Sequence, residues 1–206
     1  MTVLGDEERR AAARALWARG DYATVGDLVA GAGPALCERV GVAGLDVLDV
    51  GTGTGNTALA SARAGGRVTG VDLTPELLAV ARRRADAAGL QVEWREADAL
   101  SLPCPDAAFD RVLSTFAVMF APDPRRAASE LVRVCRPGGV IGVQLDARQR
   151  VRAPRHGSRG VPAGPAAQGS GPAGLGRAGG GARLLRRLAG PAVVRRGSGR
   201  GVVPQR

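Results

Sequence analysis

The feature that most constrains the fold is a short apolar run that leads directly into a glycine-rich loop, LDVLDVGTGTGN at residues 45–56. Residues 45–50 have the composition of a buried strand, and Gly51, Gly53 and Gly55 follow it. Glycine tolerates a positive φ and lets a ligand lie against the main chain, so such a loop between a strand and a helix is typical of nucleotide-binding α/β folds. The loop alone is weak evidence, because glycine-rich turns also serve tight packing.

Two acidic residues strengthen the nucleotide-binding interpretation. Asp72 stands at the end of the next strand-like segment, 21 positions after Gly51, and Asp98 follows the third segment. A carboxylate at the first of these positions can accept hydrogen bonds from both ribose hydroxyls of a nucleoside. The loop itself reads G-x-G-x-G, with Asn56 where the dinucleotide fingerprint G-x-G-x-x-G has its third glycine, which argues against a dinucleotide.

Strand-like segments alternate with helical ones along the middle of the chain. The expected strands are residues 45–50, 67–72, 91–95, 109–115 and 140–145. Two of the intervening helices open with a capping residue and a proline, Thr74 before Pro75 and Asp123 before Pro124. This alternation predicts an α/β fold with a Rossmann-like, doubly wound parallel sheet, and residues 1–40 predict a helical cap before it.

The charge of the chain is unevenly distributed. All 29 basic residues are arginine, and the 13 in residues 147–206 leave 16 to face all 19 acidic residues in 1–146. The net charge of +10 therefore belongs to the C-terminal segment, and we expect no specific nucleic-acid partner.

Cysteine usage and hydropathy favour a cytoplasmic protein. Cys37, Cys104 and Cys135 are scattered without a CxxC spacing, which predicts reduced thiols and no metal site. No apolar run reaches about 18 residues, so we expect no membrane span. The charged residues 6–10 are unlike a signal peptide. Nothing in the sequence indicates an oligomeric state.

Four segments together resemble the class I S-adenosylmethionine-dependent methyltransferases, of the small-molecule type that includes the ubiquinone and menaquinone biosynthesis enzymes. They are VLDVGTGTGN (47–56), VTGVDLTPELLAVAR (68–82), EADALSLPCPDAAFDRVLSTFAVMFAPD (96–123) and ELVRVCRPGGVIGV (130–143). The resemblance extends over about residues 1–145 and is specific for the cofactor but not for the methyl acceptor. It implies transfer of a methyl group from S-adenosyl-L-methionine to a small organic acceptor.

The resemblance implies roles at the methionine end of the cofactor. The loop with Gly51, Gly53 and Gly55 would wrap the methionine portion, and Asp49 would lie near its charged amino group. Ser114 would border both the methionine moiety and the acceptor cavity.

It also implies roles at the adenosine end. Asp72 would hold the ribose hydroxyls, and Leu73 would touch the adenine. Asp98 would bond the adenine amino group, with Ala99 beside the ring.

The methyl transfer itself requires no protein nucleophile, because the sulfonium methyl group is already electrophilic. We assign no catalytic residue: a general base is needed only if the acceptor must lose a proton, and His156 reads as a solvated bystander. Several side chains are candidates for an acceptor pocket, although core packing is the more ordinary role of each. They are Trp17, Tyr22, Phe116, Met119 and Phe120.

We divide the chain into a helical cap at 1–40, a cofactor-binding core at 41–146 and a tail at 147–206. The tail holds 13 Arg, 14 Gly and 6 Pro and no Phe, Tyr, Trp, Met or Ile, which predicts disorder and a sheet truncated after the fifth strand. Only residues 182–189 look locally helical within it.

The composition of the tail suggests a shifted reading frame. A chain that uses Arg and never Lys points to a GC-rich gene, whose out-of-frame codons yield mostly Arg, Gly, Pro and Ala. Permitted codons for residues 145–153, shifted by one base, read WTPDSGFV, similar to a segment that one branch of the family carries after its fifth strand. We hypothesise that the native frame is lost near Leu145, and sequencing of the gene tests this. Two alternatives to a methyltransferase stay open: a truncated, nonenzymatic product and an NAD-dependent oxidoreductase.

Overall fold

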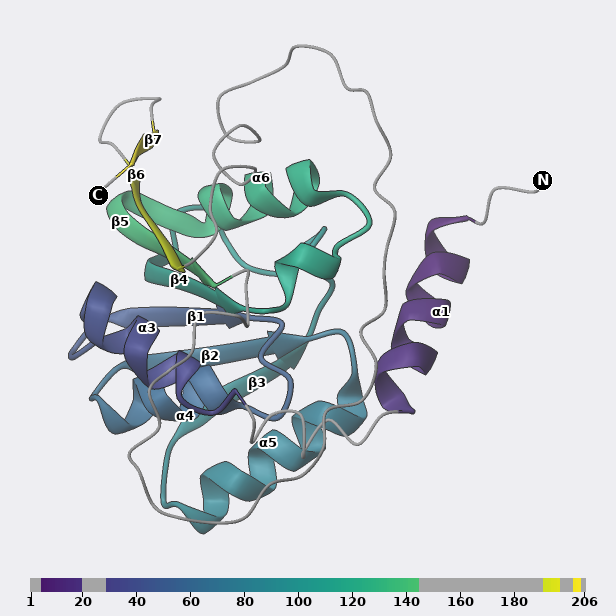
Figure 1. Cartoon of the computed structure of the whole chain (residues 1–206), viewed down its shortest axis with the longest axis horizontal. Coiled ribbons are helices and arrows are strands. Elements are labelled where there is room, and N and C mark those ends of the chain that lie inside the picture. The colour runs from purple at the N-terminus through teal and green to yellow at the C-terminus, as the bar shows by residue number, and fades with distance from the viewer. Residues whose placement is uncertain (1–4, 20–28, 145–190, 197–201, 205–206) are drawn as a thin grey trace, which may run out of the picture.

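The computed structural model describes residues 5–19, 29–144, 191–196 and 202–204. Within these residues, seven strands form one sheet in the order β3-β2-β1-β4-β5-β6-β7 (Figure 1). The strands are β1 (Asp46–Val50), β2 (Arg67–Asp72), β3 (Val92–Glu96), β4 (Phe109–Thr115), β5 (Cys135–Gln144), β6 (Pro191–Arg196) and β7 (Val202–Pro204). The first five strands run parallel to one another, which confirms the predicted Rossmann-like α/β fold.

Helices lie before, between and beside the parallel strands. They are α1 (Asp6–Ala18), α3 (Ala32–Val40), α4 (Asn56–Arg63), α5 (Pro75–Ala87), the short 3-10 helix η1 (Val118–Phe120) and α6 (Pro124–Val134). None of these described helices is long and apolar enough to cross a membrane. Residues 20–28 of the predicted helical cap lie outside the described residues.

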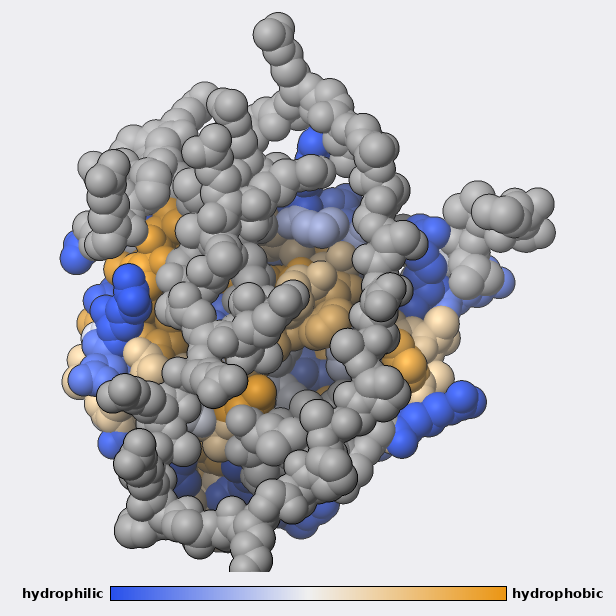
Figure 2. Space-filling view, viewed as in Figure 1, coloured by the Kyte–Doolittle hydropathy of each residue, from blue (hydrophilic) through white to orange (hydrophobic). Residues whose placement is uncertain are grey.

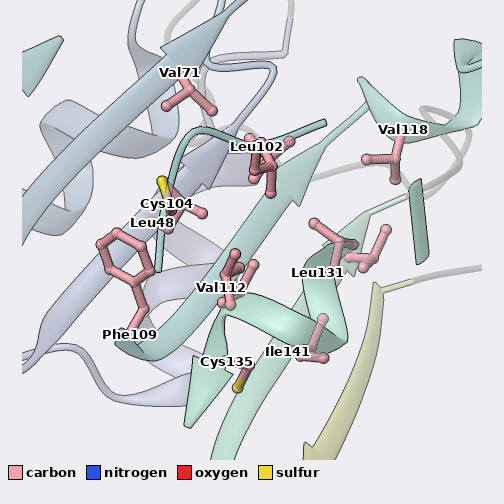
Figure 3. Packing of buried hydrophobic residues seen from close by; sticks show 13 residues of the cluster. Leu48, Val71, Leu102, Cys104, Phe109, Val112, Val118, Leu131, Cys135 and Ile141 are labelled. Carbon is pink, nitrogen blue, oxygen red and sulfur yellow. The ribbon is translucent and has the colours of Figure 1, made fainter. Parts of the chain in front are cut away.

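The core consists of two apolar clusters on opposite faces of the sheet. Val47 packs with side chains of α3 and α4, whereas its neighbour Leu48 packs with Leu131 and Val134 of α6. Figure 3 shows this second cluster, in which Leu131, Val112 and Ile141 converge from α6, β4 and β5. Successive strand residues point to opposite faces, so a strand covered on both sides needs apolar side chains on both, as Val47 and Leu48 of β1 provide.

The prediction that the sheet ends at the fifth strand is wrong. β6 pairs antiparallel with β5, where Val194 lies opposite Ile141 and Val193 opposite Gly142. Because β5 is buried, its open edge would leave backbone donors and acceptors unpaired, and the β-branched pair in PAVVRR suits a strand that covers it. The average composition of the tail hid this short run. Residues 145–190, with the helix expected at 182–189, lie outside the described residues.

The two helix starts that look alike in sequence differ in the structure. The side chain of Asp123 accepts hydrogen bonds from the backbone N–H groups of Arg125 and Arg126, as an N-cap should. Thr74 occupies the N-cap position of α5 but makes no capping hydrogen bond with its side chain. Helix α1 has Gly5 at its N-cap.

Candidate functional site

A cavity of about 410 Å³ opens at the carboxyl ends of the parallel strands. The loops after β1, β2, β3 and β4 line it, and η1 and the C-terminal half of α1 complete the wall. Seven of the nine predicted site residues line this cavity: Asp49, Gly51, Gly53, Asp72, Leu73, Asp98 and Ala99. The two others, Gly55 and Ser114, do not.

The three glycines of the loop have different physical requirements. Gly51 has φ +67°, and a Cβ there would overlap the Cβ of Ala117 from the loop after β4. Gly53 has φ +54° but open space around its Cβ position. Gly55 has φ +91°, and its Cβ would lie 3.1 Å from Ala81 of α5, so it serves the packing of α4 on the neighbouring helix.

Asp49 is a buried carboxylate at the edge of the cavity. It is 1% exposed, and Thr52 Oγ1 donates a hydrogen bond of 2.6 Å to its Oδ2. Burial raises the pKa of Asp49 to about 7, although Thr52 and the backbone amide of Ala58 in the first turn of α4 oppose the rise. Oδ1 nonetheless makes no hydrogen bond of normal geometry. An orphaned buried acceptor beside a cavity is suited to a charged donor from a ligand.

Asp72 connects the end of β2 to the glycine loop. Its Oδ2 accepts a hydrogen bond of 2.8 Å from the backbone N–H of Gly53, and its Oδ1 accepts one of 2.9 Å from that of Thr74. Burial raises the pKa of Asp72, and these backbone donors oppose the rise. Each carboxylate oxygen has two lone pairs, so Asp72 can hold the loop and still accept hydroxyl groups of a ligand.

Two hydrogen bonds, one to each oxygen, fix the carboxylate of Asp98. Its Oδ1 accepts a hydrogen bond of 2.8 Å from the backbone N–H of Leu100, and its Oδ2 accepts one of 2.7 Å from Nε of Arg10 on α1. No sequence pattern indicates this partner in α1, because Arg10 lies 88 positions away in the chain.

Ser114 acts beneath the cavity and is fully buried. Its Oγ donates to the backbone carbonyl of Val50 at 2.9 Å and accepts from the backbone N–H of Val118 at 3.4 Å. It thereby ties β4 to β1 and to η1. Between these contacts Phe116 adopts φ +58°, which is uncommon for a bulky residue and turns the chain over Gly51.

The remaining wall of the cavity is aromatic and apolar. Trp17, Phe116 and Phe120 line it, and the rings of Trp17 and Phe120 meet edge to face with centroids 5.1 Å apart. Met119 is 45% exposed and is not part of the lining. Tyr22 lies outside the described residues, as does His156.

A Rossmann-like sheet with a glycine loop after β1, acidic residues at the carboxyl ends of β1 and β2 and a further one just after β3 is typical of nucleotide-binding α/β domains. A family of methyltransferase domains matches residues 48–143, the segment that contains these features. Residues 48–143 therefore form a methyltransferase domain.

Three known proteins illustrate the similarity. An uncharacterized protein of Mycobacterium tuberculosis is 49% identical over 140 residues, which make up 67% of this chain and 51% of that protein. The demethylmenaquinone methyltransferase of Thermus thermophilus is 50% identical over 99 residues, or 47% of this chain and 45% of that enzyme. The crystal structure of the [4+2]-cyclase SpnF matches with 37% identity and a TM-score of 0.53, over 56% of this chain and 44% of that one. The chain thus spans about half the length of the curated relatives it matches.

Proposed function

We propose that the chain binds S-adenosyl-L-methionine in this cavity and transfers its methyl group to a small organic acceptor. The supporting observation is the pair of buried carboxylates, Asp49 and Asp72, on adjacent strands beside the glycine loop. The free oxygen of Asp49 suits the ammonium group of the methionine portion. The ribose hydroxyls suit Asp72, which keeps lone pairs available.

The other predicted roles fit the same orientation of the cofactor. Leu73 and Ala99 offer apolar contact to an adenine, and Asp98 offers its carboxylate to the amino group. Gly55 and Ser114 support the site through packing and backbone hydrogen bonds instead of lining it. We retain the division into a cap at 1–40, a core at 41–146 and a tail at 147–206, and a cytoplasmic location, as parts of this proposal.

When bound, S-adenosylmethionine supplies an electrophilic methyl group. The residues of the chain orient the acceptor in line with the bond that breaks and exclude water from it. Trp17, Phe116 and Phe120 provide the apolar wall for that purpose. Among the described lining residues, the titratable groups are the three aspartates already assigned to the cofactor, so we assign no general base.

Calorimetric titration of the full chain with S-adenosylmethionine and, separately, with NAD tests the proposal. We expect saturable binding of S-adenosylmethionine alone, and Asp72→Ala should weaken it by roughly 10- to 100-fold, because a charged hydrogen-bonding group contributes about 1.5–3 kcal/mol. Asp86→Ala, which removes an exposed aspartate from α5, is the matched control and should bind like the wild type. Binding of NAD would favour an oxidoreductase. If neither ligand binds, the result would favour a truncated, nonenzymatic product.

Methyl transfer needs its own assay, because SpnF has this fold and is described as a cyclase. The name of the Thermus relative makes a reduced naphthoquinone the first acceptor to test. Transfer of radioactive methyl from S-adenosylmethionine to the naphthoquinol supports a methyltransferase. Saturable cofactor binding without transfer to any acceptor of a broad panel would favour a cyclase-like use of the fold.

A further inference from the structure

Helix α1 is attached to the rest of the protein in an unusual way. None of its residues whose exposure is described is buried, and Leu16 is 61% exposed. Figure 1 shows the helix at the edge of the molecule, apart from the helices that cover the sheet. In Figure 2, blue and orange side chains alternate on that side. Burial of apolar surface therefore contributes little to its position.

Two arginines of α1 contact the rim of the cavity instead. Arg10 donates from Nε to Asp98 Oδ2, with a distance of 2.7 Å. Arg14 donates from Nε to the backbone carbonyl of Leu73 at 3.1 Å and forms an ion pair with Glu96. All three partners stand at or just after the carboxyl ends of β2 and β3, where the adenosine would lie.

One face of the helix makes all of these contacts. Arg10, Ala13, Arg14 and Trp17 are spaced at i, i+3, i+4 and i+7, which places them on one side of an α-helix. Ala13 and Trp17 line the cavity directly, and the Trp17 ring rests on Phe120 of η1. The two arginines thus hold α1 against the residues at the ends of β2 and β3, and the tryptophan holds it against η1.

We propose that Arg10 and Arg14, here called the arginine clamp, are positioning residues that retain the bound cofactor by holding α1 across the adenosine end of the cavity. This inference rests on the proposed function. Arg14 fixes the carbonyl of Leu73 next to the adenine position, and Arg10 fixes the carboxylate of Asp98. Because a carboxylate offers about four lone-pair sites and two are used, Asp98 binds Arg10 and an adenine amino group together.

The contacts of the arginine clamp are weak enough to open. Both arginine side chains are partly exposed, at 48% and 43% of the side chain, so each ion pair is weak and is screened by salt. A helix none of whose described side chains is buried has few contacts to lose when it moves away. The cofactor therefore enters when the ion pairs open and stays bound longer when they close.

The test measures the dissociation rate of radioactive S-adenosylmethionine from the full chain after addition of excess unlabelled cofactor. We expect Arg14→Ala to speed dissociation by about 3- to 10-fold and the double variant Arg10→Ala/Arg14→Ala by about 10- to 30-fold, in keeping with two exposed ion pairs and one hydrogen bond. Arg14→Lys should recover part of the effect, because lysine keeps the charge opposite Glu96. Arg83→Ala, an exposed arginine of α5, is the matched control and should leave the rate unchanged.

Salt separates the clamp from a general effect on folding. Between about 0.05 M and about 0.5 M NaCl, the wild-type dissociation rate should rise toward that of the double variant, whose own rate stays nearly constant. The urea midpoint of the double variant should match the wild type, which shows that the sheet is intact. If the wild type binds S-adenosylmethionine saturably and the double variant releases it at the wild-type rate, the clamp is overturned. If the wild type does not bind the cofactor, the proposed function fails first, and the clamp with it.

Discussion

At the scale of single residues, the three glycines of the loop after β1 meet three different requirements of backbone conformation and packing. Gly51 needs both a positive φ and an empty Cβ position, whereas Gly53 needs only the positive φ. Gly55 keeps α4 close to α5. The sequence pattern treats all three as equivalent, because it reports the residue type and not the neighbour that each Cβ would meet.

The pair Gly51→Ala and Gly53→Ala tests this difference. Both substitutions introduce strain at positive φ, which costs on the order of 1 kcal/mol. Gly51→Ala adds an overlap with Ala117 and should cost about 2–4 kcal/mol in total, in line with overpacking of a filled site. Urea unfolding at a single pH gives both values. Equal losses of stability in the two variants would contradict this expectation, because they would mean that the loop after β4 moves to accommodate the new methyl group at no cost.

At the scale of the element, the cap of α6 depends on a single carboxylate. Asp123 bonds the backbone N–H groups of Arg125 and Arg126, and α6 buries Leu131 and Val134 against the sheet. Asp123→Ala should therefore lower the free energy of unfolding by about 1 kcal/mol. Asp123→Ser keeps a capping oxygen and should lose only a few tenths of that amount. Thermal and urea unfolding of both variants check the difference, and an alanine variant as stable as the serine variant would contradict it.

The pairing of strand β6 could not be predicted from its own sequence. Its partner β5 precedes it in the chain, and residues 145–190 between the two strands lie outside the described structure. Its two valines favour a β-strand, but this preference is a weak signal in a six-residue segment among glycines and arginines. An exposed edge of the sheet decides the pairing, and that edge exists only after the parallel strands have assembled.

For the whole molecule, the buried aspartates set how stability depends on pH. The pKa of Asp49 is about 7 in the folded protein and near 4 in an unfolded chain, so the folded state binds more protons between these values. Stability should therefore fall as the pH rises from about 4 to about 7, by up to about 4 kcal/mol from this group, and Asp72 acts in the same direction. The pKa values of Asp46, Asp110 and Glu130 are lowered by arginine partners, so their contributions are lost only at more acidic pH.

Asp49→Asn provides the measurement. Asparagine has nearly the same shape and no charge to bury, so the variant should be more stable than the wild type at pH 8 and differ little from it at pH 5. Its affinity for S-adenosylmethionine should fall, because the ammonium group loses its carboxylate. Urea midpoints at the two pH values test the first expectation and calorimetry the second. A wild-type midpoint that fell no more than that of the variant between pH 5 and pH 8 would exclude a raised pKa at Asp49.

The sequence by itself determined the parallel sheet, its strand-loop-helix unit and the acidic residues on one rim. These follow from local periodicity and from the rule that parallel strands end at the same edge. Only the tertiary structure decided that Gly55 and Ser114 support the cavity without lining it, that Phe116 turns over Gly51, and that Arg10 reaches Asp98. It also decided that a segment of the tail covers β5. Each of these depends on contacts between residues far apart in the chain, and no local pattern records which distant atom will fill a given space.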